Sequence, residues 1–336
     1  MVHAMEAEPG SALSWRAVRH TAEHMAAAAL EFAGGVPASQ HAHFLHPFGD
    51  AARYDWGYTP RSRPGLPLRD MSGLQRRSAW ALVDALLSAD GAAKVRGVLA
   101  LETMLQERTA DKAYRDPLNY ALALFGMPGS SPWGWRFEGH HVSLTVTIVP
   151  GIGIAVTPHF LGANPFSGRV VGGRHGGLAP VLERESALAF ELVSGLDATG
   201  LRQAMIAAEP PPDFLTGPGR ERSLREPVGL RIEDMAAEQA ARAVALLETF
   251  FEHLQADLAG MVMARVRKAG LGQIRFAWAG ATTPDRLHYY RLHGPTLLVE
   301  YDRTDTDHAH SVWHDPTNHF GEDYLRRHHE TAHSSG

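Results

Sequence analysis

The chain contains no cysteine, and this absence excludes several kinds of chemistry at once. Disulfide bridges, iron–sulfur clusters, thiolate zinc sites and cysteine nucleophiles all require the missing thiol. Any metal site in this chain must therefore use ligands other than thiolate. Because a chain without disulfides suits a reducing compartment, we expect a cytoplasmic protein.

Lysine is also scarce, and arginine supplies nearly all of the positive charge. The net charge is -5 with histidine neutral, so no basic field favours nucleic acid as a partner. No apolar run approaches the roughly 20 residues of a membrane-spanning helix. The acidic segment 1–10 also lacks the apolar core of a signal peptide. We therefore expect neither a nucleic-acid nor a membrane partner.

Two hydrophobic periodicities alternate along the chain. Helical spacing predicts helices over 14–32, 72–87, 92–109, 117–125, 182–196, 198–208, 232–259 and 323–329. Period-two spacing predicts two strands within 137–157 and further strands over 274–279, 287–292, 297–302 and 308–313. The Gly-rich segment 161–180 is predicted to be a loop, and we identify no internal repeat. The fold class is therefore α+β, with an antiparallel sheet from strands near 137–157 and 274–313 packed against several helices.

The most informative motif is His308-Ala309-His310, which follows the apolar run 297–301. Residues two apart on a β-strand point to the same face, so these imidazoles form a ready pair of metal ligands. Nearby His314, Asp315 and His319 are further ligand candidates whose participation stays open. The alternative interpretation is a polar, His-rich surface loop.

A second pair, His140-His141, opens a strand-like segment far upstream. On a strand, His141 would share the polar face of Ser143 and be the natural ligand, while His140 would need a buried partner such as Glu138. The alternative for His140 is an ordinary hydrogen-bonded core histidine. If the two histidine-bearing strands are neighbours, three or four imidazoles converge on one point.

Tyr290 and Arg291 form a third candidate group. The planar fork of Arg291 would clamp an acidic group of a substrate, and Tyr290 would orient it. Aromatic packing with a solvated arginine tip is an equally good interpretation. By contrast, His41, His43 and His46 imitate ligand spacing within an irregular segment, so we interpret them as a decoy.

Several spaced blocks of this chain resemble a family catalogued as domain of unknown function 3500. The blocks that carry the likeness are Trp133–Leu144, Tyr289–Arg291 with Gly294-Pro295, Glu300–Asp302, His308–Trp313, Phe320-Gly321 and His328. The likeness runs from about Tyr54 to His329, which implies one integrated domain over 1–336. We divide it into a helical part of about 14–126 and a mixed α+β part of about 127–329. The family pattern leads us to expect an arginine near His314 and an acidic residue near His319, which makes both weaker ligand candidates.

These observations lead to a metal-dependent enzyme that acts on a small organic molecule, which Arg291 would bind if it is acidic. The metal ligands would be His140, His141, His308 and His310, and the catalytic residues Glu138, Tyr290 and Arg291. The cofactor would be a divalent transition metal: iron, copper or zinc. Oxidative chemistry is slightly favoured, and zinc-type hydrolysis with Glu138 as general base is second.

Two further hypotheses remain open. The histidines could perform acid–base chemistry without metal, or the chain could be a non-catalytic protein that binds a small molecule. The latter predicts that His141 and His308 lie far apart. Nothing in the sequence indicates an oligomeric state.

Overall fold

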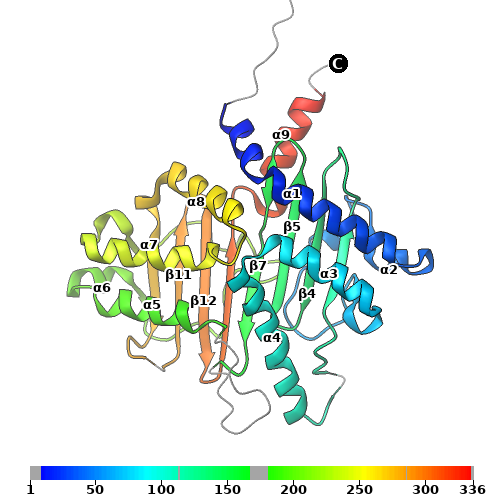
Figure 1. Ribbon diagram of the computed structural model, residues 1–336. Helices are drawn as coiled ribbons and strands as arrows, with labels where there is room; N and C mark the ends of the chain where they lie inside the picture. Colours follow the sequence, from blue (N-terminus) through cyan, green and yellow to red (C-terminus); the bar gives the residue numbers. More distant parts are fainter. Residues whose placement is uncertain (1–8, 113, 167–180, 285, 334–336) are drawn as a thin grey trace, which may run out of the picture.

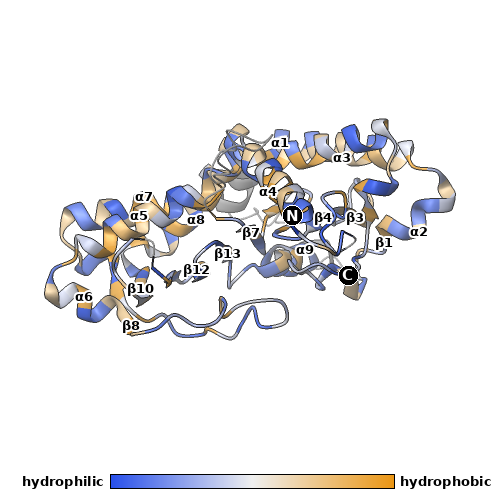
Figure 2. Cartoon of the chain, turned by 90° about the horizontal axis from the view of Figure 1, so that it is seen from below, coloured by the Kyte–Doolittle hydropathy of each residue, from blue (hydrophilic) through white to orange (hydrophobic). Residues whose placement is uncertain are grey.

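A single wide sheet organises the computed structural model, which describes residues 9–112, 114–166, 181–284 and 286–333. The thirteen strands of these residues belong to one sheet with the order β1-β3-β4-β5-β7-β13-β12-β11-β10-β8, and β2, β6 and β9 pair at its sides. Helices α1, α3, α4, α5, α7 and α8 cover one face (Figures 1 and 2). The α+β class predicted from the sequence is confirmed.

The strands fall into two groups that meet at β7 and β13. The first group is β1 (Leu45–His46), β2 (Leu66–Pro67), β3 (Ala121–Phe125), β4 (Trp133–Gly139), β5 (Val142–Val149), β6 (Gly153–Ala155) and β7 (His159–Ala163). The second is β8 (Met205–Ala207), β9 (Leu230–Arg231), β10 (Arg275–Gly280), β11 (His288–Gly294), β12 (Leu297–Asp305) and β13 (His308–His314). Antiparallel pairing of β7 with β13 joins the groups into one continuous sheet.

The helices are α1 (Pro9–Gly35), α2 (His41–Phe44), α3 (Gly73–Leu86), α4 (Ala89–Arg108), α5 (Glu183–Ser194), α6 (Ala198–Ala204), α7 (Ala237–Phe251), α8 (Ala256–Gly270) and α9 (Glu322–His333). Short 3₁₀ turns cover Ala38–Gln40, Ala51–Arg53, Leu68–Asp70, Ile232–Asp234, Leu271–Gln273 and His319–Gly321. The chain sets several helix starts locally. Ser72 and Gln75 form a capping box at the start of α3, and the Ser88 side chain accepts from the Gly91 amide at the start of α4.

The two halves of the chain repeat one order of elements. A 3₁₀ turn and two helices, α3 and α4, precede β3, β4, β5 and β7, just as a 3₁₀ turn, α7 and α8 precede β10 to β13. The edge pairings repeat as well: β1 and β8 pair in parallel with β3 and β10, while β2 and β9 pair antiparallel with them. The two halves therefore share a topology, although we identify no internal repeat in the sequence itself.

Several predicted element types are also wrong. The segment predicted as a helix over 117–125 ends in strand β3, whose residues are buried on both sides. The helix predicted over 198–208 stops at Ala204 and continues as strand β8. The helix predicted over 232–259 is a 3₁₀ turn followed by two helices, α7 and α8. The loop predicted over 161–180 begins within strand β7, and its residues 167–180 lie outside the described residues.

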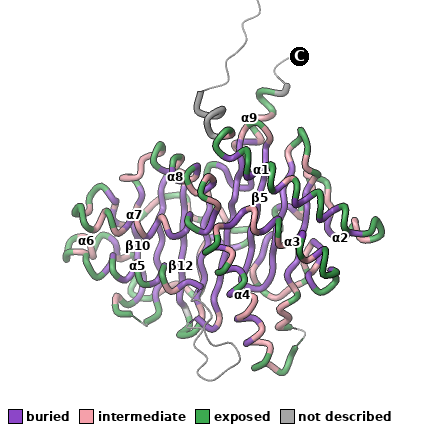
Figure 3. The backbone as a smooth tube through the Cα atoms, viewed as in Figure 1, coloured by how far each residue is buried: buried purple, intermediate pink, exposed green. Residues whose placement is uncertain are grey.

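Both faces of the sheet are covered, so most strand residues are buried (Figure 3). The helix-covered face holds the main hydrophobic core, which includes Trp135, Leu144, Tyr290 and Tyr301. The opposite face carries most of the buried polar side chains and a smaller aromatic cluster of Trp56, Phe160, Phe214, Val312 and Phe320. None of the described helices combines the length and apolar character that crossing a membrane requires.

Candidate metal centre

The first two histidines of the candidate site lie at the start of β13, as the sequence predicts. His308 is the first residue of the strand, and His310 follows two positions later on the same face. Their ring centroids are 4.5 Å apart. In the sheet, His310 lies between Asp302 on β12 and Gly162 on β7, so three strands fix its position.

The third histidine, His141, lies in the turn between β4 and β5 and not on a strand. Its φ of 62° is in the left-handed region that few non-glycine residues adopt. The turn is held in place because the His141 amide donates to the Tyr58 carbonyl and the Gly162 amide donates to the His141 carbonyl. The strand-face argument for His140 and His141 is therefore wrong, because both residues belong to the turn.

Glycine at position 162 leaves room for the His141 ring. A Cβ atom built on Gly162 would lie 2.8 Å from ring atoms of His141, closer than real contacts allow. Strand β7 lies between the two histidine-bearing segments. At position 162 it carries glycine, the one residue without a Cβ atom that would displace the imidazole.

These three histidines converge. The Nε2 atoms of His141 and His308 are 2.8 Å apart, and the ring centroids of His141 and His310 are 5.3 Å apart. One ligand atom from each of the three residues lies within 4.8 Å of the others. Nitrogen ligands at about 2.1 Å from one ion lie roughly 3 to 3.5 Å from each other, so small ring rotations suffice. His141, His308 and His310 thus form a buried group that can hold a metal ion.

Two carboxylates orient the His310 ring. Its Nδ1 is 3.1 Å from Asp213 Oδ1 and 3.4 Å from Asp302 Oδ2. Its Nε2 is buried and has no hydrogen-bond partner among the described residues. Carboxylates on one imidazole nitrogen commonly fix the other nitrogen as a metal ligand. Asp213 lies in the Pro-rich segment 210–227, and its role could not be recognised from sequence because that segment carries no periodic pattern.

The environment sets different protonation preferences within the group. Burial, together with the neighbouring imidazoles, lowers the pKa of His308 to about 4 and that of His141 well below its usual value. Burial also disfavours the charged form of His310, but Asp302 and Asp213 outweigh it and raise the His310 pKa to about 9. Two neutral imidazoles and one that balances carboxylate charge therefore face a common point.

The structure places His140 outside this group. Its Nδ1 is 2.5 Å from Glu102 Oε2, and its Nε2 is 2.9 Å from Arg115 Nη1. The ring stacks on His141 with centroids 3.7 Å apart. Glu102, on α4, thus takes the partner role that the sequence assigned to Glu138. His140 supports the ring of His141 and is not in the group that can hold a metal.

The Glu138 carboxylate is surrounded by three arginine side chains. Its carboxylate pairs with Arg63 and Arg136 at 3.0 Å and with Arg61 at 3.4 Å. It also accepts hydrogen bonds from the Gly57 amide and the Ser143 hydroxyl. Both oxygens are therefore engaged in holding the segment around 57–63 to the sheet.

Tyr290 and Arg291 lie on opposite faces of β11 because they are adjacent residues of a strand. The Tyr290 hydroxyl donates to the Glu185 carbonyl of α5, so Tyr290 is on the helix-covered face and the sheet separates it from His308 and His310. Arg291 is buried on the face that carries the histidines and pairs in register with Glu300 of β12. Its own strand, β11, is the second strand from β13 in the sheet. The structure does not bring either residue to the three histidines.

The loop over His310 is fixed by carboxylates of β12. Glu300 accepts from the amides of Leu215 and Thr216, and Asp302 accepts from the amide of Phe214. Tyr58 donates its hydroxyl to Asp213, and its ring stacks on Phe160 with centroids 4.5 Å apart. Aromatic rings therefore enclose one side of the histidine group.

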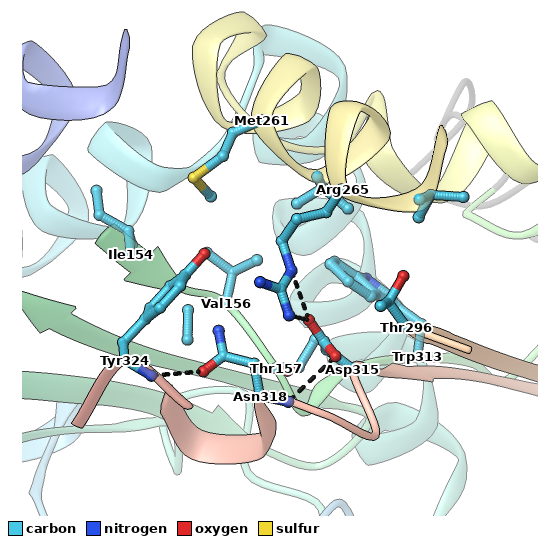
Figure 4. Close-up of a pocket in the computed structure, with 13 residues that line it drawn as sticks. Ile154, Val156, Thr157, Met261, Arg265, Thr296, Trp313, Asp315, Asn318 and Tyr324 are labelled. Atoms are coloured by element: carbon cyan, nitrogen blue, oxygen red, sulfur yellow. Dashed lines mark hydrogen bonds and ion pairs between the residues drawn. The ribbon is translucent and has the colours of Figure 1, made fainter. Parts of the chain in front are cut away.

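The other end of β13 holds the further candidates His314, Asp315 and His319. His314 is six strand residues beyond His308, which corresponds to a separation of roughly 20 Å. Asp315 pairs with Arg265 at 3.0 Å and accepts from the Asn318 amide at the wall of a small cavity (Figure 4). That cavity has a volume of about 20 Å³, room for little more than a water molecule. The decoy residues His41, His43 and His46 lie in α2 and β1, outside the groups that can hold a metal.

Comparison with known proteins gives a family and no activity. The family model described as "Protein of unknown function (DUF3500)" matches residues 18–322, and the chain belongs to this family. No curated protein and no solved structure matches the chain.

Proposed function

We propose that this member of the DUF3500 family is a metal-dependent enzyme acting on a small organic molecule, with His141, His308 and His310 as the metal ligands. The observation that carries the proposal is the state of His310. Its Nδ1 faces two carboxylates, while its buried Nε2 has no partner among the described residues and belongs to the group of three imidazoles. Burying an unpartnered polar atom is unfavourable unless something occupies it, and a metal ion would do so.

Three protein ligands leave coordination positions for substrate. When bound, the metal would supply a Lewis-acid or redox centre with open positions. The residues around it have distinct tasks. Asp213 and Asp302 hold the His310 ring, Tyr58 and Phe160 restrict access of water on one side, and the His140 ring stacks on that of His141.

Oxidative chemistry with iron or copper is our first choice and zinc-dependent hydrolysis our second. Hydrolysis would use Glu138 as its general base, but that carboxylate is bound by Arg61, Arg63 and Arg136. Both of its oxygens are already engaged by the arginines, the Gly57 amide and the Ser143 hydroxyl, so neither is placed to take a proton from a water molecule at the metal. The proximity of the histidines also removes the separation that the binding-protein hypothesis predicts.

A metal-free acid–base site is the competing proposal, because the 2.8 Å contact between His141 and His308 also fits a hydrogen bond between imidazoles. Metal analysis of protein purified without chelator distinguishes the two. We expect close to one equivalent of iron, copper or zinc, and its loss in His308→Ala. Protein that holds no metal above trace and binds none of these ions when they are added would overturn the metal-dependent proposal.

A further inference from the structure

Arg115 lies one imidazole away from the proposed metal ligands. It follows α4 in the segment that leads to β3, and its Nη1 is 2.9 Å from Nε2 of His140. His140 in turn stacks on His141 at a centroid distance of 3.7 Å. The positive charge of Arg115 is near enough to contribute to the lowered pKa of both histidines, after the larger effect of burial.

The protein balances this charge only in part. Glu102 is the nearest carboxylate, and its oxygen is 3.8 Å from Arg115 Nη1 while it contacts His140 at 2.5 Å. The other guanidinium nitrogens, Nε and Nη2, have no hydrogen-bond partner among the described residues. The Arg115 side chain retains 21% of its exposure, so solvent and small molecules reach it.

Arg63, the other arginine whose charge acts on His140, shows what a purely structural arginine does in this fold. Its side chain is 2% exposed, and its Nε pairs with Glu138 at 3.0 Å. Its two remaining nitrogens donate to the carbonyls of Arg61 and Thr59. Arg63 thus donates from both terminal nitrogens and pairs its charge with a carboxylate at 3.0 Å, whereas Arg115 makes its hydrogen bonds to described residues through Nη1 alone and is 3.8 Å from its nearest carboxylate.

The aspartates near His308 and His310 already have hydrogen-bond partners of their own. Asp213 and Asp302 face His310 Nδ1 and the Phe214 amide. Asp305, near His308, accepts from Thr306 and from the amide of Asp307 in its own turn. An arginine beside neutral imidazoles and a bound cation would be repelled by that cation unless an anion lies between them.

We propose that Arg115 binds the carboxylate of the substrate, so that the enzyme acts on small organic acids. The inference rests on the proposed function, because it places the substrate between Arg115 and the metal. It moves to Arg115 the role that the sequence suggested for Arg291. The planar fork of arginine matches a carboxylate with two parallel hydrogen bonds, which its Nε and Nη2 atoms can supply.

The test uses the full chain loaded with one equivalent of Co²⁺, whose visible spectrum reports ligands entering the site. Glycolate and its neutral analogue glycolamide are titrated in turn, and the ratio of their dissociation constants is measured. We expect the wild-type protein to prefer glycolate and Arg115→Gln to reduce that preference by about tenfold or more, the effect of losing hydrogen bonds to a charged group. Arg115→Lys keeps the charge and should show an intermediate preference.

The matched control is Arg69→Gln, which removes an arginine paired with the neighbouring Asp116. It should retain the wild-type preference. A Co²⁺ spectrum without probe that is the same in Arg115→Gln and wild type shows that the site has folded. An unchanged preference in Arg115→Gln, or no preference in the wild type, would overturn the role of Arg115. Failure of the wild-type chain to bind Co²⁺ would instead overturn the metal-dependent function.

Discussion

The Nε2 atoms of His308 and His141 lie 2.8 Å apart although 167 positions separate these residues in the chain. The contact exists because β7 pairs with β13 on one edge and with β5 on the other, so the β4–β5 turn meets the start of β13. The site therefore lies at the junction of the two halves of the fold, and neither half holds it alone.

Removing either of these imidazoles should abolish tight metal binding. In His141→Ala and His308→Ala, two nitrogen ligands remain, and we expect the affinity for Zn²⁺ to fall more than about 100-fold, beyond what loss of an outer partner costs. Isothermal titration calorimetry measures the change. His43→Ala removes an imidazole from helix α2 and should bind like wild type. Equal affinities in all variants would contradict this ligand assignment.

The carboxylates behind His310 should tune the centre without being ligands. We expect Asp213→Asn to lower Zn²⁺ affinity by about 10- to 100-fold, because the imidazole loses an anionic partner that fixes its orientation and raises its basicity. Asp305→Asn makes the same change of charge near His308 but leaves His310 untouched, and it should have a much smaller effect. Identical losses in the two variants would show that only the net charge matters.

The sequence was sufficient for the part of the site that depends on local periodicity. The spacing of His308 and His310 predicts a shared strand face, because strand geometry has a period of two. It was insufficient for His141, whose left-handed turn conformation is set by contacts with Tyr58 and Gly162 from distant segments. Asp213 was missed for the same reason, since only the fold brings it to His310.

The internal repeat had a weak signal that composition and periodicity do not reveal. Trp135-Arg136-Phe137 ends two residues before Gly139 at a β-hairpin, and Tyr290-Arg291-Leu292 ends two residues before Gly294 at the equivalent hairpin. The matching residues are few because each half packs against different neighbours, so the shared topology is far clearer than the shared sequence. One half provides His141 and the other His308 and His310, which is why the chemistry itself shows no repeat.

Gly162 offers a test of the fit around His141. In Gly162→Ala, the added methyl group would meet the His141 ring at 2.8 Å, so the imidazole must move. We expect weaker Zn²⁺ binding with little loss of secondary structure, measured by calorimetry and circular dichroism. Gly260→Ala, at a position in α8 with open space around it, serves as the control and should bind normally. Unimpaired binding by Gly162→Ala would mean that the position of the ring is not critical.

Acid should destabilise the fold partly through His159, which has no role in the proposed centre. Burial lowers its pKa from 6.5 to about 3, and neither ring nitrogen has a partner among the described residues. The native state keeps this imidazole neutral, while the unfolded chain binds a proton below about pH 6.5. The contribution of the neutral, buried His159 to the free energy of unfolding is therefore complete above pH 6.5 and is lost as the pH falls toward 3.

His159→Phe removes this one proton-linked group while filling similar space beside Trp313, whose ring centroid is 5.9 Å away. The free energy of unfolding should decrease in both proteins when the pH is lowered from 7 to 5. We expect this decrease to be about 2 kcal/mol smaller in the variant than in wild type. Urea unfolding followed by tryptophan fluorescence at the two pH values measures the difference. Exposed His24→Phe should behave like wild type, because its ring stays in water when the chain folds. If His159→Phe keeps the full wild-type loss, His159 must already be protonated in the native state near pH 5, and its charge must then be balanced within the buried helix-side core.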